Sequence, residues 1–155
     1  MARTSRKIDN TLQQNRVPSV KAALYVRLSN EDNGGRGSDS IHNQLELLLN
    51  FAEEFEEMEI VETYTDNGRT GTDFDRPEWE RMLADIKEKK INCVIVKDLS
   101  RFARNYLEAG DYLEKIFPFL GVRFIAVNDH YDSAGGIFKE KDLITDFKNL
   151  ANDYY

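Results

Sequence analysis

A largely apolar run at residues 92–96 constrains the fold of this chain more than any other stretch of its sequence. A strand with one solvated face alternates apolar and polar residues, whereas a parallel strand covered on both faces is apolar throughout. Segments with apolar residues at helical spacing lie before and after this run, at residues 77–86 and 106–120. The run therefore predicts the central strand of a mostly parallel sheet with helices on both faces.

The remaining sequence alternates strands and helices in the same way. We expect further strands at residues 22–28, 59–64 and 122–127, and a last amphipathic helix after a loop at residues 132–136. Ser40 is a suitable N-cap for a helix that runs to about Phe55, and Pro77 suits the first turn of the next helix. Gly121 would end the helix at residues 106–120. The predicted fold class is α/β, with a mostly parallel sheet of four to five strands flanked by helices.

Length and composition fit a single domain. The chain has 155 residues, of which 41% are hydrophobic and 32% charged. Residues 1–19 are polar and lack periodicity, so we expect a flexible arm there and one folded domain over residues 20–155. No apolar run reaches the roughly 18 residues that a membrane span needs. The basic N-terminus also lacks the apolar stretch of a secretory signal, so we expect a soluble, cytoplasmic protein without membrane contact.

Cysteine and histidine are too scarce for the common metal sites. Cys93 is the single cysteine, which excludes an internal disulfide framework and a cysteine-cluster zinc site. His42 and His130 are expected at the surface. The glycines near residue 35 do not form a Walker loop, because no Gly-Lys-Ser/Thr follows them. We therefore expect no metal and no cofactor.

The charge of the chain limits how it could contact nucleic acid. The formal net charge is −7. The first twenty residues hold four basic residues and one acidic residue, so the rest of the chain carries −10. A domain that binds DNA by itself usually has a basic face, because phosphate neutralisation supplies most of its affinity. We expect weak nucleic-acid binding by this chain alone, with any phosphate chemistry concentrated in a few arginines.

Three predicted strand ends deliver arginines and a serine to one edge of the sheet. Taken singly, each segment is explained at least as well without a function: the first as a surface hydroxyl beside a salt-bridged arginine, the second as a mobile loop before a helix, and the third as a solvated, charged turn. Ligands of open α/β sheets bind at the carboxyl ends of the strands. The residues that converge there are Ser29 and the arginines Arg27, Arg76, Arg101 and Arg104. A serine that is activated and surrounded by guanidinium groups suits phosphoryl transfer by positioning and electrostatic stabilisation without a metal.

Four sequence elements together resemble the catalytic domain of the serine recombinases, the resolvase/invertase family, and especially its large-integrase and transposon-excision branch. In chain order they read Tyr25-Val26-Arg27-Leu28-Ser29, Ser40-Ile41-His42-Asn43-Gln44, Asp75-Arg76-Pro77 and Lys97-Asp98-Leu99-Ser100-Arg101-Phe102-Ala103-Arg104-Asn105. The resemblance covers about residues 21–155. Their order and spacing are far more specific than any one of them.

The resemblance implies a site-specific recombinase in which Ser29 attacks a DNA phosphodiester. The product would be a 5′-phosphoserine link and a free 3′-hydroxyl, so that strands can be exchanged and rejoined. The four arginines would surround the scissile phosphate, with supporting contacts from Gln44, Tyr25, Ser100 and Asp98. The family also implies a homodimer that pairs into a tetramer. The chain ends at Tyr154-Tyr155 without a capping signal, which suggests a catalytic domain without the DNA-binding part of its parent protein.

One position departs from the pattern, and two other functions stay open. Many small resolvases have an aspartate where this chain has Ser100, with Asp98 two positions earlier; no histidine is well placed, so the general base is not assigned. A relative that serves only as an assembly partner is one alternative. A receiver-like signalling module is another, although it needs paired acidic residues after the first strand, where Arg27 and Ser29 stand instead.

Overall fold

The computed structural model describes residues 20–28, 40–66, 76–103 and 105–134. The expected arm at residues 1–19 and the expected last helix after residue 136 lie outside the described residues. No helix in the described part of the chain combines the length and apolarity needed to cross a membrane.

The described strands form a single sheet in the order β2-β1-β3-β4-β5. Its members are β1 (Val20–Arg27), β2 (Met58–Asp66), β3 (Cys93–Val96), β4 (Arg123–Ala126) and β5 (Tyr131–Asp132). β1 pairs in parallel with both β2 and β3, and β3 pairs in parallel with β4. The short β5 runs antiparallel to β4. The prediction of a mostly parallel sheet of four to five strands is confirmed.

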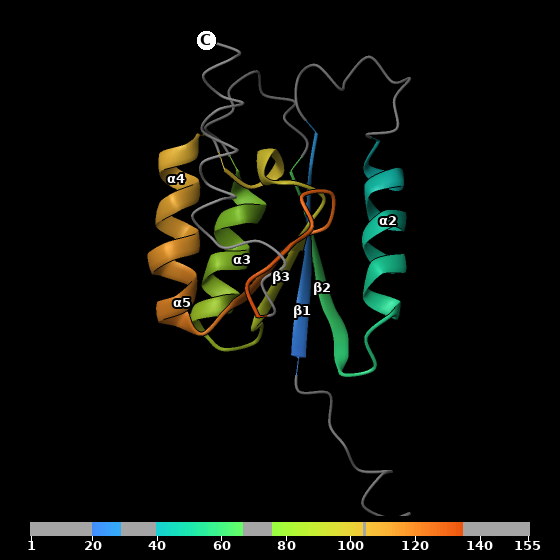
Figure 1. Ribbon diagram of the computed structural model, residues 1–155, viewed down its shortest axis with the longest axis horizontal. Coiled ribbons are helices and arrows are strands. Elements are labelled where there is room, and N and C mark those ends of the chain that lie inside the picture. Colours follow the sequence, from blue (N-terminus) through green and yellow to red (C-terminus); the bar gives the residue numbers. More distant parts are fainter. Residues whose placement is uncertain (1–19, 29–39, 67–75, 104, 135–155) are drawn as a thin grey trace, which may run out of the picture.

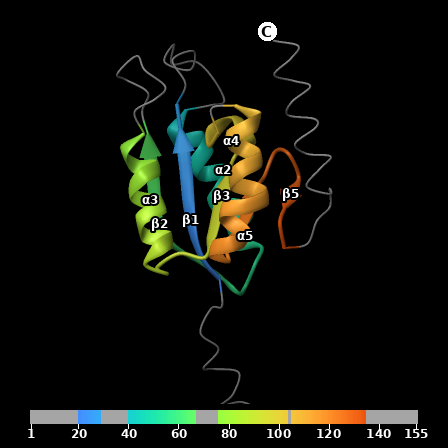
Figure 2. The same cartoon turned by 90° about the vertical axis from the view of Figure 1, so that its left-hand side faces the viewer.

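Helices cover both faces of this sheet (Figure 1). On one face lies α2 (Ile41–Glu53), and on the other lie α3 (Pro77–Lys87), α4 (Tyr106–Asp111) and α5 (Phe117–Leu120). Seen from the face that carries α3, α4 and α5, these helices lie in front of the strands and α2 lies behind them (Figure 2). Each layer has its own apolar cluster, and every residue of β3 is buried between them. This arrangement explains why the run at residues 92–96 does not alternate.

Local signals place the helix ends where the sequence predicts them. The Ser40 hydroxyl accepts a hydrogen bond of 3.1 Å from the backbone N–H of Asn43 and so caps α2. Pro77 is the first residue of α3, where its missing N–H leaves no intrahelical bond unmade. Gly121 ends α5 in the left-handed region at φ 69°, which glycine adopts without strain.

The structure differs from the sequence-based expectation in three elements. The helix expected at residues 106–120 is divided by a π-helical segment, Tyr112–Ile116, just before Pro118. Proline has no N–H for the preceding turn and its ring crowds the carbonyl four residues earlier, which accounts for the wider turn there. β2 continues two residues further than expected, to Asp66. β5 overlaps the loop expected at residues 132–136 by one residue, Asp132, because two residues are too few to show a strand period.

Candidate active site

The carboxyl end of β1 and the turn after β3 are joined by hydrogen bonds in both directions, because an arginine of each donates to backbone carbonyls of the other. The Arg27 guanidinium donates from Nε to the carbonyl of Arg101 (3.2 Å) and from Nη2 to that of Ser100 (2.7 Å). In return the backbone carbonyl of Arg27 accepts a hydrogen bond of 3.1 Å from Nη1 of Arg101. The same carbonyl accepts from Nε2 of Gln44, on α2, at 3.3 Å. Side chains from β1, α2 and the β3 turn therefore meet two residues before Ser29.

Asp66 connects the end of β2 with the start of α3. Its buried carboxylate accepts a hydrogen bond of 2.8 Å from the Tyr25 hydroxyl and 3.1 Å bonds from the backbone N–H groups of Glu78 and Trp79. The carboxylate thus satisfies N–H groups that have no partner within the helix. Its own backbone carbonyl also accepts from the N–H of Leu28 at 3.1 Å. Asp66 therefore ties β1, β2 and α3 together beside the converging arginines.

Arg76 precedes α3 and is 6% exposed. One terminal nitrogen donates to the backbone carbonyl of Phe102, and the other donates to a carboxylate oxygen of Glu108 on α4 at 2.6 Å. Its guanidinium also lies 5.2 Å from the centre of the Trp79 ring. These contacts fix Arg76 next to the residue that follows Arg101. The start of α3 and the turn after β3 are thereby held together.

The turn after β3 is a single 3₁₀ turn, Leu99–Arg101, and Arg101 is 7% exposed. The Ser100 hydroxyl donates to the Asp98 carboxylate, and an oxygen of Asp98 lies 3.9 Å from Nε of Arg101. Asp98, two positions before Ser100 in the sequence, thus lies next to Arg101 in the arginine cluster. The N–H of Leu99 donates at 2.9 Å to Asp129, whose pKa is raised by its burial. The turn is therefore anchored from both β3 and β4.

The surroundings of Tyr25 favour its neutral phenol. Burial raises the pKa of Tyr25 well above its ordinary value, and the charge and hydrogen bond of Asp66 add to the effect. The hydroxyl of Tyr25 therefore stays protonated at neutral pH and remains a donor. Both histidines lie exposed as predicted: His42 is 4.0 Å from Glu46 on the outer side of α2, and His130 follows β4. Neither lies in the arginine cluster, and the general base stays unassigned.

The structure brings together all the predicted site residues that it describes. They are Tyr25, Arg27, Gln44, Arg76, Asp98, Ser100 and Arg101. Ser29 and Arg104 lie outside the described residues. Sequence reasoning missed Asp66 and Glu108. A carboxylate at a strand end before a helix was a usable signal for Asp66, whereas the pairing of Glu108 with Arg76 depends on how α3 and α4 pack.

Potential metal ligands do not gather in this region. The described residues contain no group of three or more His, Cys, Asp or Glu side chains arranged to hold a metal ion. The order β2-β1-β3-β4 with helices on both faces also occurs in receiver-like folds, so strand order alone does not decide the function. The guanidinium groups and amide at the carboxyl edge suit a phosphate oxyanion.

Solved structures similar to this chain include catalytic domains of recombinases and integrases. The N-terminal catalytic domain of TP901-1 integrase shares 26% identity with a TM-score of 0.67, over 86% of this chain and 96% of that one. A resolvase family site-specific recombinase from Streptococcus pneumoniae shares 33% identity with a TM-score of 0.66, over 87% of both chains. The C-terminal catalytic domain of ISC1926 TnpA, an IS607-like serine recombinase, shares 18% identity at a TM-score of 0.55 and shows the fold alone.

Residues 22–145 match the family model described as Resolvase, N terminal domain. The chain therefore belongs to the resolvase family and is the catalytic domain of a site-specific serine recombinase. No significant match was found among curated protein sequences. The resemblance in the sequence motifs is confirmed, and membership of this family implies a DNA substrate and an oligomeric assembly.

Proposed function

We propose that Ser29 is the nucleophile of the recombination reaction. Its Oγ forms a bond to a DNA phosphorus while the bond from that phosphorus to O3′ breaks. The electron pair of the broken bond stays on O3′, which takes up a proton and becomes a free 3′-hydroxyl, while the Ser29 hydroxyl gives up its proton, so that the number of protons is conserved. The product is a 5′-phosphoserine ester, and reversal of the same step by a new 3′-hydroxyl rejoins the strands without an external energy source.

The bonding at the Arg27 carbonyl is the observation that best supports this proposal. Arg101 and Gln44 both donate to it, and Arg27 itself donates to the carbonyls of the turn that carries Arg101. A preorganised set of donors costs little reorganisation when negative charge develops in the transition state. We propose that Arg27, Arg76, Arg101 and Arg104 stabilise that charge. Gln44, Tyr25, Ser100 and Asp98 support them.

Substitution of the proposed nucleophile tests the chemistry directly. We expect Ser29→Ala to abolish the covalent protein–DNA adduct formed with a nicked duplex that traps the intermediate, with thermal unfolding unchanged. Ser38→Ala, from the same segment of sequence, is the matched control and should form adduct at the rate of the unsubstituted protein. Adducts are resolved by denaturing electrophoresis. Persistence of the adduct in Ser29→Ala would place the nucleophile at another residue.

Chelation tests whether arginines rather than a metal supply the positive charge. Guanidinium groups keep their charge at any working pH and bind phosphate oxygens in pairs. We therefore expect adduct formation to continue in EDTA at the same rate. Complete loss that is restored by added magnesium would contradict this mechanism.

We further propose that residues 20–155 form the catalytic domain and residues 1–19 an arm, in a protein of the cytoplasm. We also propose that the active assembly is a homodimer that pairs into a tetramer. Exposed apolar side chains on α4 and α5 support an assembly surface, since Leu107 is 68% and Phe119 88% exposed. Analytical ultracentrifugation with and without target DNA measures the assembly. A monomer that forms adducts at full rate would contradict the proposed assembly.

A further inference from the structure

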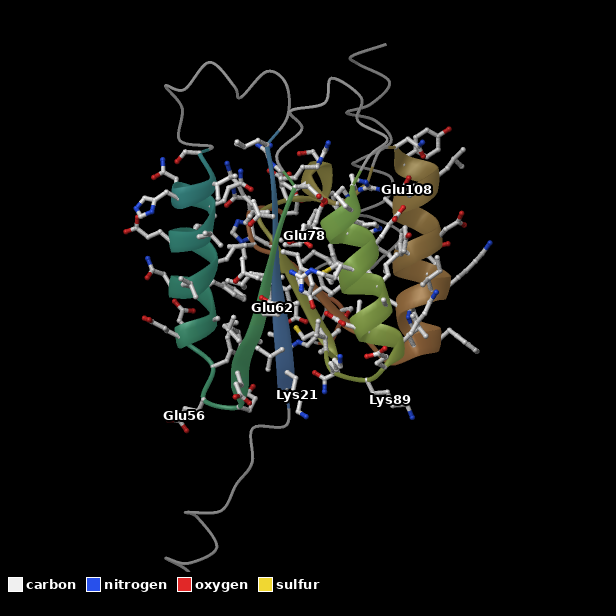
Figure 3. The ribbon with its side chains drawn as sticks, turned by 180° about the vertical axis from the view of Figure 1, so that it is seen from behind. Lys21, Glu56, Glu62, Glu78, Lys89 and Glu108 are labelled. Atoms are coloured by element: carbon white, nitrogen blue, oxygen red, sulfur yellow. The ribbon has the colours of Figure 1, made fainter. Side chains whose placement is uncertain are left out.

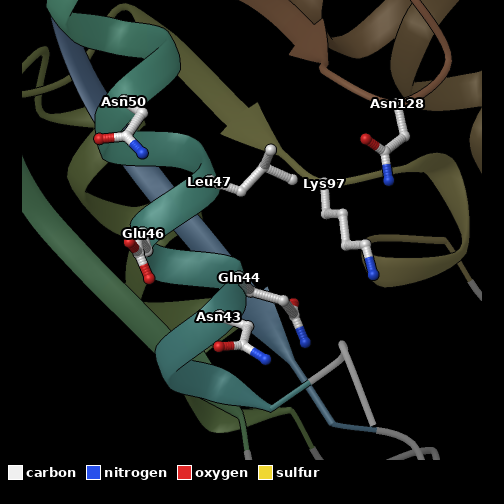
Figure 4. Close-up of a pocket in the computed structure, with 7 residues that line it drawn as sticks. All are labelled: Asn43, Gln44, Glu46, Leu47, Asn50, Lys97 and Asn128. Carbon is white, nitrogen blue, oxygen red and sulfur yellow. The ribbon is translucent and has the colours of Figure 1, made fainter.

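A polar groove lies beside the arginine cluster on the α2 side of the sheet. Its volume is about 460 Å³, and its lining comes from α2 and from the segments that follow β3 and β4 (Figure 4). The lining residues are Asn43, Gln44, Glu46, Leu47, Asn50, Lys97 and Asn128. Four of these seven carry side-chain amides, and Lys97 is the cation. These side chains place hydrogen-bond donors and amide acceptors along the groove, beside apolar parts of the lining such as Leu47.

Gln44 belongs both to this groove and to the candidate active site. Its side chain lines the groove, and its Nε2 donates to the backbone carbonyl of Arg27. Lys97 follows β3 directly, two residues before the turn that carries Arg101. The N–H of Asn128 donates to the carbonyl of Lys97 at 2.8 Å, so the two strand ends that bear the groove residues are fixed to each other. The groove is therefore joined to the arginine cluster through Gln44.

We infer that this groove holds the DNA backbone next to the scissile phosphate, with Lys97 as an electrostatic contact to a non-scissile phosphate. The inference rests on the proposed function, because that function places one phosphate at the arginines. A strand that leaves them on the α2 side meets the groove next. Lysine serves as a point charge for phosphate, and the amides of Asn43 and Asn128 supply donors on either side.

The groove carries one residue of each charge, Lys97 and Glu46, so substitutions of the two should change DNA affinity in opposite directions. Lys97 is half-buried and its side chain lines the groove (Figure 4). Glu46 is an exposed carboxylate on the same lining, and it would repel a phosphate there. Removal of the lysine charge should weaken DNA binding, and removal of the glutamate charge should strengthen it.

The chain offers a matched control for each charge. Lys89 and Glu56 are exposed and lie at the end of the molecule away from the carboxyl ends of the strands (Figure 3). Lys89→Met and Glu56→Gln change the net charge by the same amounts as Lys97→Met and Glu46→Gln. They therefore separate contact in the groove from the general effect of net charge.

The experiment measures the affinity of the full chain for a fluorescent duplex of arbitrary sequence by anisotropy between 20 and 200 mM salt. Each lost phosphate contact lowers the slope of log affinity against log salt by about 0.9. We expect that reduction for Lys97→Met but not for Lys89→Met, with the two affinities converging as salt rises. Glu46→Gln should bind more tightly than Glu56→Gln. Equal slopes for the two lysine variants would overturn the inference.

Adduct formation by the unsubstituted protein keeps this inference separate from the proposed function. Adducts together with equal slopes would overturn the phosphate contact at Lys97 while leaving the chemistry at Ser29 intact. Different slopes without any Ser29-dependent adduct would support the groove contact and overturn the proposed nucleophile.

Discussion

At the scale of single residues, the site depends on the geometry of arginine rather than on positive charge alone. Arg27 uses two N–H groups of one planar fork to reach two successive carbonyls, those of Ser100 and Arg101. The ammonium group of lysine cannot reproduce that fork at one position. The carbonyl of Arg27 in turn organises Gln44 and Arg101. A single residue, through its side chain and its backbone carbonyl, therefore bonds to three others.

The first residue-scale prediction is that Arg27→Lys lowers the rate of adduct formation by about 10²–10³-fold, the usual effect of losing one preorganised donor. The charge is kept, so DNA affinity should change little. Single-turnover adduct formation at saturating DNA measures the rate. Arg81→Lys is the control, because Arg81 pairs with Glu78 on the exposed side of α3. An equal rate for Arg27→Lys and Arg81→Lys would show that charge alone is sufficient.

At the scale of elements, buried polar groups join the ends of strands to the starts of helices. Asp66 accepts from Tyr25 and from two N–H groups of α3, which makes three donors for one carboxylate. An asparagine presents one oxygen and one NH₂ group, so at least one donor would face another donor. The start of α3, beside Arg76, should therefore be the most sensitive junction in the fold.

We predict that Asp66→Asn lowers the free energy of unfolding by about 1–3 kcal/mol, the cost of buried groups left without partners. Tyr25→Phe should cost about 0.5–1.5 kcal/mol, because one hydrogen bond is lost while the backbone donors keep theirs. Urea unfolding measures both. The double variant should cost less than the two single changes together, since they share one bond. If the two single losses of unfolding free energy added up to that of the double variant, the Tyr25–Asp66 hydrogen bond would contribute nothing to stability.

The β4–β5 junction should respond to acid. Burial alone would raise the pKa of Asp132, but hydrogen bonds from Arg123 and from the N–H of Ala134, together with the Arg123 charge, lower it overall. A lowered folded-state pKa stabilises the fold above the unfolded value of 3.8. This stabilisation is lost as the pH falls through the folded-state pKa. Asp132→Asn should flatten the stability profile below pH 4, and an unchanged profile would contradict this assignment.

The elements also show what the sequence could and could not predict. The apolar run at β3, the cap at Ser40 and the ends marked by Pro77 and Gly121 are local signals, and each is confirmed. The convergence of Arg27, Arg76 and Arg101 follows from the rule that parallel strands end at one edge. The Arg76–Glu108 pair could not be predicted, because it joins residues 32 positions apart through the packing of α3 against α4.

At the scale of the whole molecule, the single cysteine, Cys93 in the central strand β3, can report on global unfolding. Cys93 is fully buried in β3, and burial raises the pKa of its thiol to about 12. A thiol that is both neutral and covered does not react, since the thiolate is the nucleophile. We predict that the native chain resists iodoacetamide at pH 8 and that labelling proceeds only at the rate of global opening. Denaturant dependence measured by mass spectrometry checks this, and labelling independent of denaturant would indicate a local opening of β3.

The reciprocal bonds at Arg27 also have a consequence for synthesis of the protein. Arg27 and its partner Arg101 are separated by 74 positions, and the contact between Arg76 and Glu108 completes the same region. A ribosome must therefore release the chain as far as Glu108 before all of these groups can meet. A growing chain that has not yet reached Arg101 lacks the donor to the Arg27 carbonyl, and one that has not reached Glu108 also lacks the carboxylate that accepts from Arg76. The arrangement at the carboxyl edge of the sheet can therefore form only late in synthesis of this part of the chain.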